Sequence, residues 1–338
     1  MDVSATMLDR AHGALAGLAV GDALGMPTQA FTRAEIVKRF GVLQDLRSGP
    51  PDQPIAPSAP AGQVTDDTEQ ALLLADQLVT SGGHVDPVRW AQALDRWEQR
   101  MKGSGSLDLL GPSTRRAIER IRAGEDPRLA GLDGTTNGGA MRIAPVALAV
   151  PWSDGPEALV DRVVEACLPT HHTGTAIAGA AAVAAAVSCA LDGCSYDDVV
   201  AAAITCARLG ETRGRQHPGP SVAARLQWVL VDAPRYEPDR LEEWITAVVG
   251  TTVATAESVP AAFALLDVAI ASPRDGLCRA ARLGGDTDTI AAMLGAMTGA
   301  TVGRSGLPDD WCTTVESVNG LSLDAVAAGL LQLREGNS

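Results

Sequence analysis

The chain has 338 residues, of which 46% are hydrophobic and 20% charged, and this composition excludes disordered and fibrous proteins. Its net charge of -14 repels phosphate backbones and anionic membranes, so we expect no direct binding of nucleic acid and no membrane partner. Aromatic residues make up only 3% while glycine is abundant, which favours closely packed helices over a β-sandwich.

Apolar residues recur at helical spacing along most of the chain, and no hairpin turn joins two alternating strands. We therefore predict an all-α fold in one compact domain over residues 1–338. The predicted helices, in chain order, are Leu8–Met26, Asp67–Thr80, Pro87–Met101, Thr114–Ala123, Gly138–Ala149, Pro156–Cys167, Thr173–Leu191, Tyr196–Leu209, Ser221–Val231, Arg240–Val249, Pro260–Ala271, Asp288–Gly303 and Leu323–Leu333.

The first of these helices and the one that starts at Asp288 each carry glycine at every fourth position. On a helix this spacing leaves one face without side chains, so that a neighbouring backbone or a ligand can approach closely. Helix packing is the favoured explanation, and approach to a ligand is the alternative. The glycines are Gly13, Gly17, Gly21 and Gly25, and then Gly295, Gly299 and Gly303.

The cysteines and the apolar segments predict a cytoplasmic protein. The six cysteines form no C-x-x-C pair and have mostly apolar neighbours, which indicates reduced, buried thiols. Met1–Arg10 lacks the basic start of a signal peptide. The longest apolar run, Ala176–Leu191, is too short and too rich in alanine to span a bilayer, so we expect a buried helix.

The segment at residues 46–63 contains five prolines and interrupts the helical pattern. It is predicted to be a surface loop and, because it ends beside the most acidic motif of the chain, a mobile lid. A second loop, Gly210–Gly219, carries Arg213, Arg215 and His217 and is a candidate rim element.

Two short segments, TDDTE at Thr65–Glu69 and GGDTDT at Gly284–Thr289, each combine carboxylates with threonine hydroxyls. Taken singly, each is explained by helix capping, with Asp66 and Glu69 forming a capping box in the first. If the two helix starts converge, however, their four aspartates would repel one another unless cations lay between them. Oxygen ligands favour Mg²⁺ or Mn²⁺ over zinc, and four carboxylates are enough for two such ions.

Two further segments are candidates for substrate contacts. In Asn137–Arg142 (NGGAMR), free backbone N–H groups at a helix start can hold phosphate or sugar oxygens, although a tight turn explains the glycines equally well. In Thr170–Thr173 (THHT), the paired histidines suggest zinc, but no third soft ligand has suitable spacing. His171 is more plausible as a polar contact in a pocket, and a capping turn is the simplest alternative.

These motifs together resemble the ADP-ribosylglycohydrolase family. The resemblance spans about residues 10–303, and the pairing of TDDT with GGDTDT in this order is its most specific part. The runs GPST and ESVP resemble a bacterial branch of the family. The matching segments are Gly17–Gly25 (GLAVGDALG), Thr65–Thr68 (TDDT), Gly111–Thr114 (GPST), Asn137–Pro145 (NGGAMRIAP), Thr170–His171, Glu257–Pro260 (ESVP) and Gly284–Thr289 (GGDTDT).

The resemblance implies an orthogonal helical fold with a central two-metal cleft holding Mg²⁺ or Mn²⁺. It implies that Thr65, Asp66 and Asp67 contact one ion, that Asp288 bridges the two, and that Asp286 and Thr289 contact the second. It further implies that His171 faces the substrate and that the ribose and phosphates are lined by Asn137, Gly138, Gly139, Ala140 and Met141.

The implied reaction is hydrolysis of the glycosidic bond at C1 of an ADP-ribosyl group on a protein or small molecule. Asp66 and Asp67 are candidate proton acceptors, because Gln29 stands where the family usually has a glutamate. The Asn137 loop has no aromatic ring to stack on adenine, and Trp90, Trp97 or Trp152 could substitute. The alternatives are hydrolysis of a smaller ribosylated metabolite or nucleoside-like compound, and a non-catalytic binding or structural protein of this fold.

Overall fold

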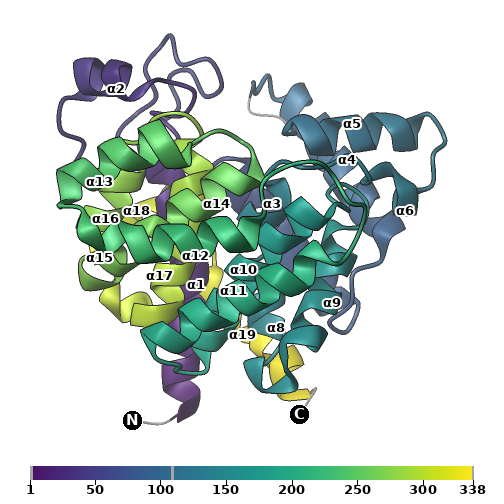
Figure 1. The fold of residues 1–338 in the computed structure, drawn as a ribbon. Helices are drawn as coiled ribbons and strands as arrows, with labels where there is room; N and C mark the ends of the chain where they lie inside the picture. The colour runs from purple at the N-terminus through teal and green to yellow at the C-terminus, as the bar shows by residue number, and fades with distance from the viewer. Residues whose placement is uncertain (1–2, 108–109, 337–338) are drawn as a thin grey trace.

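The computed structural model describes residues 3–107 and 110–336, and in this part of the chain there are helices and two isolated bridges but no strand. The all-α prediction is confirmed, and every predicted helix has a counterpart (Figure 1). The helices are α1 (Val3–Gly25), α2 (Arg33–Phe40), α3 (Asp66–Thr80), α4 (Pro87–Gly103), α5 (Pro112–Arg122), α6 (Pro127–Ala130), α7 (Gly138–Met141), α8 (Ala144–Ala149), α9 (Pro156–Cys167), α10 (Gly174–Leu191), α11 (Tyr196–Glu211), α12 (Val222–Asp232), α13 (Pro238–Trp244), α14 (Thr255–Ala264), α15 (Leu266–Ala271), α16 (Pro273–Ala280), α17 (Thr287–Val302), α18 (Asp309–Asn319) and α19 (Leu323–Gly336); short 3₁₀ or π turns are η1 (Trp152–Asp154), η2 (Ala233–Arg235), η3 (Ile245–Val249) and η4 (Arg304–Gly306).

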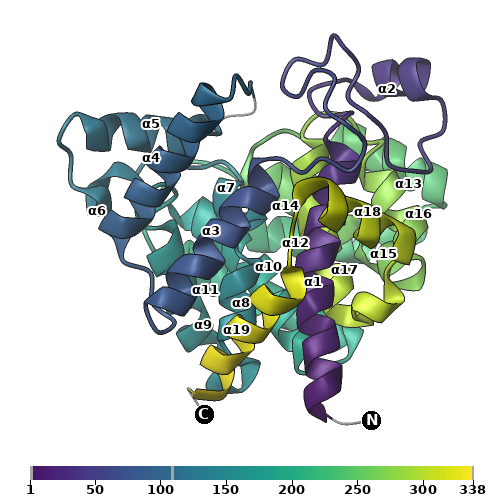
Figure 2. The same cartoon turned by 180° about the vertical axis from the view of Figure 1, so that it is seen from behind.

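The two glycine-rich helices, α1 and α17, lie against each other in the middle of the fold (Figures 1 and 2). A Cβ atom on Gly17 would lie 2.0 Å from the carbonyl oxygen of Gly295, and one on Gly13 would lie 2.3 Å from that of Gly299. The strips therefore serve helix packing, as favoured from the sequence. At the end of α1, a Cβ on Gly25 would lie 2.4 Å from the Cα of Asp288, so this contact also holds the second acidic segment in place.

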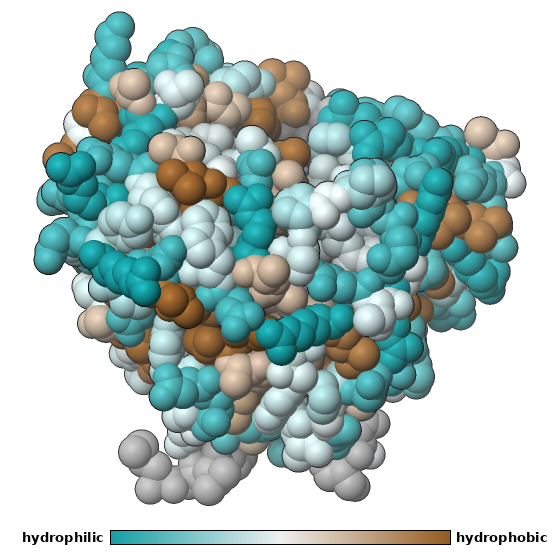
Figure 3. Space-filling model, in the orientation of Figure 1, coloured by the Kyte–Doolittle hydropathy of each residue, from teal (hydrophilic) through white to brown (hydrophobic). Residues whose placement is uncertain are grey.

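The alanine-rich helix α10 is the second central element and is buried along almost its whole length. Its length and composition alone would allow it to cross a membrane, but 94% of it is buried inside the protein. This confirms the prediction of a core helix. The outward surface in Figure 3 is mostly hydrophilic, as the high charge requires.

Helices α2, α6, α16 and α18 were not predicted, and Gly138–Ala149 divides into α7 and α8 where Pro145 starts a new helix. These helices are short, with between 4 and 11 residues, so each offers few turns over which a helical period can be recognised. A local signal was nevertheless present for α2, where Thr32 and Glu35 form a reciprocal capping box.

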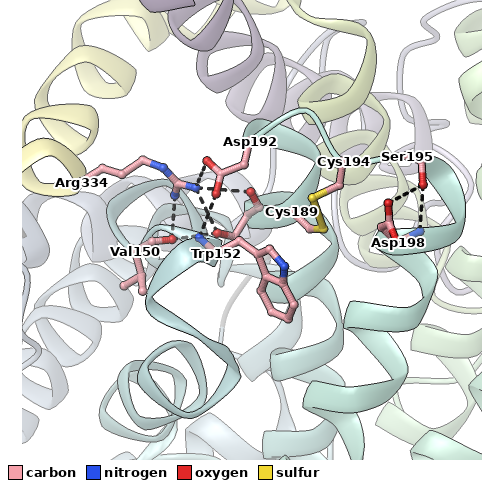
Figure 4. Close-up of a disulfide and its surroundings, with 9 residues drawn as sticks. Val150, Trp152, Cys189, Asp192, Cys194, Ser195, Asp198 and Arg334 are labelled. Carbon is pink, nitrogen blue, oxygen red and sulfur yellow. Dashed lines mark hydrogen bonds and ion pairs between the residues drawn. A yellow bond between two sulfur atoms is a disulfide. The ribbon is translucent and has the colours of Figure 1, made fainter. Parts of the chain in front are cut away.

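The expectation of six free thiols is wrong for one pair. Cys189 at the end of α10 and Cys194 in the turn before α11 form a disulfide, with Cα atoms 5.5 Å apart (Figure 4). Beside it, Asp192 accepts hydrogen bonds from the guanidinium of Arg334 in α19 and from the backbone N–H of Trp152. The five-residue spacing was not recognised because pairing depends on how the turn folds, not on the sequence interval.

The proline-rich segment at residues 46–63 is irregular, as predicted, and rises with α2 at one end of the molecule (Figures 1 and 2). It is anchored by Gln53, which is buried and donates to the carbonyl oxygens of Met26 and Gln29 at 3.2 and 3.3 Å. The side-chain oxygen of Gln53 also accepts hydrogen bonds from the backbone N–H groups of Ile55 and Ala56. Closure of this segment as a lid stays a prediction.

Candidate functional site

The start of α3 is stabilised by a residue from another helix. Asp22 of α1 is fully buried, and its carboxylate accepts from both the N–H and the hydroxyl of Thr65 and of Thr68. Thr65 itself makes no side-chain cap, and Glu69 accepts from the indole of Trp97 instead of completing a capping box. The capping explanation for Asp66 therefore fails, and the carboxylates of Asp66 and Asp67 need another explanation.

The start of α17 depends on two glycines with positive φ, Gly284 at 85° and Gly285 at 79°. Gly285 exchanges backbone hydrogen bonds with the segment at Ala30 and Phe31, and the N–H of Asp286 donates to the carbonyl of Thr251 at 2.8 Å. A Cβ on Gly285 would lie 2.3 Å from that same Thr251 oxygen. Only glycine allows this approach, which turns the chain so that α17 begins beside the end of α1.

The two acidic segments do converge. Asp67 of α3 accepts from Thr289 of α17 at 3.3 Å, and both residues are buried. Burial raises the pKa of Asp66 to about 8, with Asp22 and Asp286 as further causes, and burial raises the pKa of Asp286 to about 6. The pKa values of Asp67 and Asp288 are raised well above the usual range by burial and by the neighbouring carboxylates. Without a compensating cation, this cluster is unfavourable in its charged form.

The donor set fits hard divalent cations in its chemistry. One carboxylate oxygen of Asp67 and one of Asp288 are buried and accept no hydrogen bond from any described part of the chain. Such atoms are rare in folded proteins unless a water or an ion satisfies them. Among the described residues, however, no group of three or more His, Cys, Asp or Glu side chains is already arranged to hold a metal ion. The ligand assignments for Thr65, Asp66, Asp67, Asp286, Asp288 and Thr289 therefore stay predictions.

The Asn137 loop is tied to the second acidic segment. The side-chain amide of Asn137 donates to the carboxylate of Asp286 and, at 3.0 Å, to the hydroxyl of Ser258 in α14. Its backbone N–H donates to the carbonyl of Val253 at 2.9 Å. Asn137 thus orients Asp286, while Ser258, from the ESVP run, fixes Asn137 in turn.

His171 lies behind this loop and is fully buried. Its Nε2 is 3.1 Å from the hydroxyl of Thr136 and its Nδ1 is 2.8 Å from that of Thr170. A Cβ on Gly138 would lie 2.9 Å from the ring of His171, so the imidazole packs directly against the Asn137 loop. Burial, with a contribution from Arg142, lowers the pKa of His171 well below its usual range, which leaves the ring neutral. The direct substrate contact expected of His171 therefore finds no opening in this structure.

A buried arginine connects the histidine to the acidic cluster. The Arg142 guanidinium donates to Gln70 and, at 2.7 Å, to the hydroxyl of Thr170. Gln70 in turn donates to Asp66 at 2.8 Å, so Gln70 bridges the cation and the carboxylate. Burial lowers the pKa of Arg142 to about 10, which still leaves it charged at neutral pH. The hydrogen bonds from Arg142 to Gln70 and from Gln70 to Asp66 therefore fix the position of the Asp66 carboxylate.

These elements surround a cavity of about 310 Å³. Its wall contains three of the predicted aspartates, and the proline-rich segment and the start of α5 close it on two sides through Ile55 and Gly111. Asp67, Gly139, Ala140 and His171 lie outside the wall, and Thr65 lines a neighbouring cavity. The predicted site residues that line the cavity are Gln29, Asp66, Asn137, Gly138, Met141, Asp286, Asp288 and Thr289.

Gln29 is 5% exposed and lines this cavity. The nitrogen of its side-chain amide has no hydrogen-bond acceptor among the residues that the structure describes. The proposed aromatic substitutes for an adenine platform are not found here, because Trp90 and Trp97 are core residues and Trp152 lies beside the disulfide (Figure 4).

Sequence reasoning missed several residues of the site. Asp22 belongs to the GDALG motif, but nothing local shows that its carboxylate caps α3 from 43 residues away. Arg142 is an isolated charged residue in apolar surroundings, and a buried charge of this kind requires a partner. Gln70 follows the polar run of the TDDTE segment, so its sequence context gives no such signal. Arg115, which directly follows the GPST run, lines the cavity as the one cationic side chain among its described lining residues.

Comparison with known proteins supports the same assignment along nearly the whole chain. The family model for ADP-ribosylglycohydrolase matches residues 3–338. The protein YegU of Escherichia coli (strain K12), whose function is unassigned, is 34% identical over 328 residues, covering 97% of this chain and 98% of YegU. ADP-ribosylarginine hydrolase Tri1 of Pseudomonas putida (strain GB-1) is 31% identical over 325 residues, covering 91% of this chain and 74% of Tri1.

A solved structure named ADP-ribosylglycohydrolase-related protein complex superimposes with a TM-score of 0.69 at 28% identity, covering 97% of this chain and 99% of that one. It confirms the fold implied by the motifs. With a family model that spans the chain and relatives above 30% identity over most of it, the resemblance carried by TDDT and GGDTDT is established. The chain belongs to the ADP-ribosylglycohydrolase family, a family of hydrolytic enzymes.

Proposed function

We propose that the chain hydrolyses the glycosidic bond at C1 of an ADP-ribosyl group carried by a protein or a small molecule, with two Mg²⁺ or Mn²⁺ ions as cofactors. The observation that carries the proposal is the cavity of about 310 Å³ whose wall joins Asp66, Asp286 and Asp288 to the Asn137 loop. The relative Tri1, named as an ADP-ribosylarginine hydrolase, supports the class of substrate.

The residues that would hold the ions are Thr65, Asp66, Asp67, Asp286, Asp288 and Thr289. When bound, such ions would polarise the ribose hydroxyls and acidify a water molecule near the anomeric carbon. Their charge would also keep the buried aspartates ionised, because a nearby cation favours the carboxylate form.

In the reaction, a bond forms between the water oxygen and C1 while the bond from C1 to the leaving atom breaks. Asp66 lines the cavity and is the candidate for accepting the proton of that water, which then passes to the leaving atom. Gln29 cannot accept a proton at neutral pH, but its unpaired amide N–H can donate a hydrogen bond to water or substrate. Gln70 and Asn137 keep Asp66 and Asp286 in position.

The position of Arg115 in the cavity wall favours a substrate that carries phosphate groups. One of its terminal nitrogens donates to the carbonyl of Leu110 at 2.9 Å, and the guanidinium retains further donors for phosphate oxygens at the cavity wall. Since the chain carries a net charge of -14, a cation at this position is a specific feature of the cavity.

One observation favours a second candidate. No Phe, Tyr or Trp is found among the described residues of the cavity wall, whose apolar part consists of aliphatic side chains such as Ile55, Met141 and Val253. A wall of this kind offers adenine no ring to stack on. It therefore suits a smaller ribosylated metabolite or a nucleoside-like compound. A non-catalytic binding protein is the third possibility, and Gln29 is the residue that favours it.

The proposal is tested by measuring release of ribose or ADP-ribose, by chromatography, from an ADP-ribosylated arginine peptide and from α-ribosyl compounds without adenine. The parent protein should be active with Mg²⁺ or Mn²⁺ and inactive with a chelator. Asp66→Asn should lose activity, and Asp324→Asn, which changes an exposed aspartate of α19, is the matched control. Gln29→Glu should change the rate or the metal affinity without unfolding the protein.

The two groups of test substrates distinguish the candidate functions. Turnover of the ADP-ribosylated peptide supports the first, and turnover confined to the adenine-free compounds supports the second. Metal binding, measured by calorimetry, without turnover by either the parent or Gln29→Glu would contradict both and favour the binding protein.

A further inference from the structure

A second cavity, of about 180 Å³, lies among α11, α12, α13, α14 and α15. None of its lining residues belongs to the wall of the candidate active site. These helices gather on the face shown in Figure 1, and Figure 3 shows hydrophobic side chains exposed on the same face in the region of α11 and α12. The cavity is therefore a separate surface feature.

Aromatic rings are concentrated around this cavity in a chain that has few of them. Both tyrosines of the protein, Tyr196 and Tyr236, line it together with Phe263. Behind them, Tyr236 stacks on Trp244 with ring centroids 5.0 Å apart, and Trp228 packs edge-on against Trp244 at 5.2 Å. Tyr236 is nevertheless 38% exposed. A stacked aromatic pair that opens to solvent is unusual for a ring cluster that only fills a core.

The same cavity carries an unpaired negative charge. Asp267, at the start of α15, lines the cavity and is exposed, and its carboxylate makes no ion pair or hydrogen bond with any described residue. Tyr196 and Asp267 line the same cavity, and burial raises the pKa of Tyr196 to about 12, with contributions from the charges of Asp267 and Asp197. Elsewhere on the surface, many aspartates are paired with arginine, as Asp310 is with Arg274.

We propose that this cavity binds an organic cation, either an alkylated ammonium or a guanidinium group. Faces of aromatic rings attract cations through their quadrupole, and the attraction increases where the surroundings exclude water. The aliphatic wall at Leu230 and Leu241 provides such surroundings, and Asp267 supplies the compensating charge. The volume suits one cationic head group, since sites for drug-sized ligands begin near about 300 Å³.

The cation can be a free small molecule or the side chain of a basic residue on another protein, and the recognition chemistry is the same for both. Anions are disfavoured by the carboxylate of Asp267 in the cavity wall. A neutral molecule of the same shape would fill the cavity but would leave the carboxylate unpaired. Charge, not shape, is thus what the cavity is expected to select.

The test titrates the full chain, with a chelator present, against choline and against its neutral isostere 3,3-dimethylbutan-1-ol, and follows tryptophan fluorescence and calorimetry. Choline should bind saturably and at least tenfold more tightly than the isostere. Asp267→Asn and Tyr236→Leu should each weaken choline by about tenfold, as expected for a loss of one charge or one cation–π contact. Tyr236→Phe, which keeps the ring, and Asp324→Asn, which changes a distant exposed aspartate, should bind like the parent.

A further titration compares the affinity for arginine amide with that for an arginine-containing tripeptide. Binding of the tripeptide that is tenfold tighter or more would identify a protein side chain as the natural occupant. Equal affinity for choline and its isostere would overturn the proposal, as would the absence of saturable binding by choline and both arginine compounds. Unchanged binding by a folded Asp267→Asn variant, with folding checked by circular dichroism, would overturn it as well.

Discussion

Replacing Gly17 with alanine is the most direct test of how the carboxylate site is assembled. A Cβ at this position would lie 2.0 Å from the carbonyl oxygen of Gly295, whereas contacts under 3.0 Å are essentially never found for real Cβ atoms. The backbones of α1 and α17 would have to separate by about 1 Å. Because α17 carries Asp288 in its first turn, the same movement would disturb the acidic cluster.

The expected cost follows from two opposing effects. Overpacking of this kind destabilises proteins by about 1–3 kcal/mol. Alanine recovers up to about 1 kcal/mol through its better helix propensity. We therefore expect Gly17→Ala to lower the free energy of unfolding by about 1–2 kcal/mol.

The matched control is Gly329→Ala in α19. Its Cβ would lie 3.6 Å from Val79 Cγ2, an ordinary contact, so only the propensity gain applies and this variant should equal or exceed the parent in stability. The assay is urea unfolding followed by circular dichroism, in which a lower midpoint at an unchanged slope reports lost stability. If Gly17→Ala unfolded at the same or a higher urea concentration than the parent, the close contact between the two helices would be refuted.

Three further outcomes follow from the structure. With a chelator present, the free energy of unfolding should fall as the pH rises from about 4 to about 8, because the pKa of Asp66 is about 8 in the folded protein and near 3.8 in the unfolded chain. Urea midpoints measured across this pH range, with and without Mg²⁺, test this expectation. A free energy of unfolding that rises with pH in the chelator would contradict it. Arg142→Lys should lower the free energy of unfolding by about 2 kcal/mol, because one ammonium group cannot replace the separate hydrogen bonds to Gln70 and Thr170. Thermal unfolding measures this loss, and a midpoint equal to that of the parent would argue against the buried network. Reduction of the disulfide between Cys189 and Cys194 should lower stability by about 2 kcal/mol, as expected for a short cross-linked loop; the matched control is a Cys189→Ser variant, which should not respond to dithiothreitol.

The fold class and the positions of the two acidic segments could be read from the sequence alone, whereas the metal chemistry of the site stays a prediction. Helical periodicity is a local property, so the α-helices could be recognised even though their ends moved by a few residues. The four-residue spacing of glycine in α1 and α17 likewise predicted a close helix contact, because the spacing places the glycines on one face. The two acidic segments were visible as an excess of carboxylates over what capping requires.

How these parts meet in space could not be predicted from the sequence. Asp22 caps α3 from another helix, Gln70 links Arg142 to Asp66, and His171 lies behind the loop that it was expected to join in contacting substrate. Each of these relations joins residues from different elements, whose separation in sequence carries no information about their distance in space. The same reason explains the cation-selective cavity at Asp267, because its rings and its carboxylate come together only when α11, α13, α14 and α15 pack side by side.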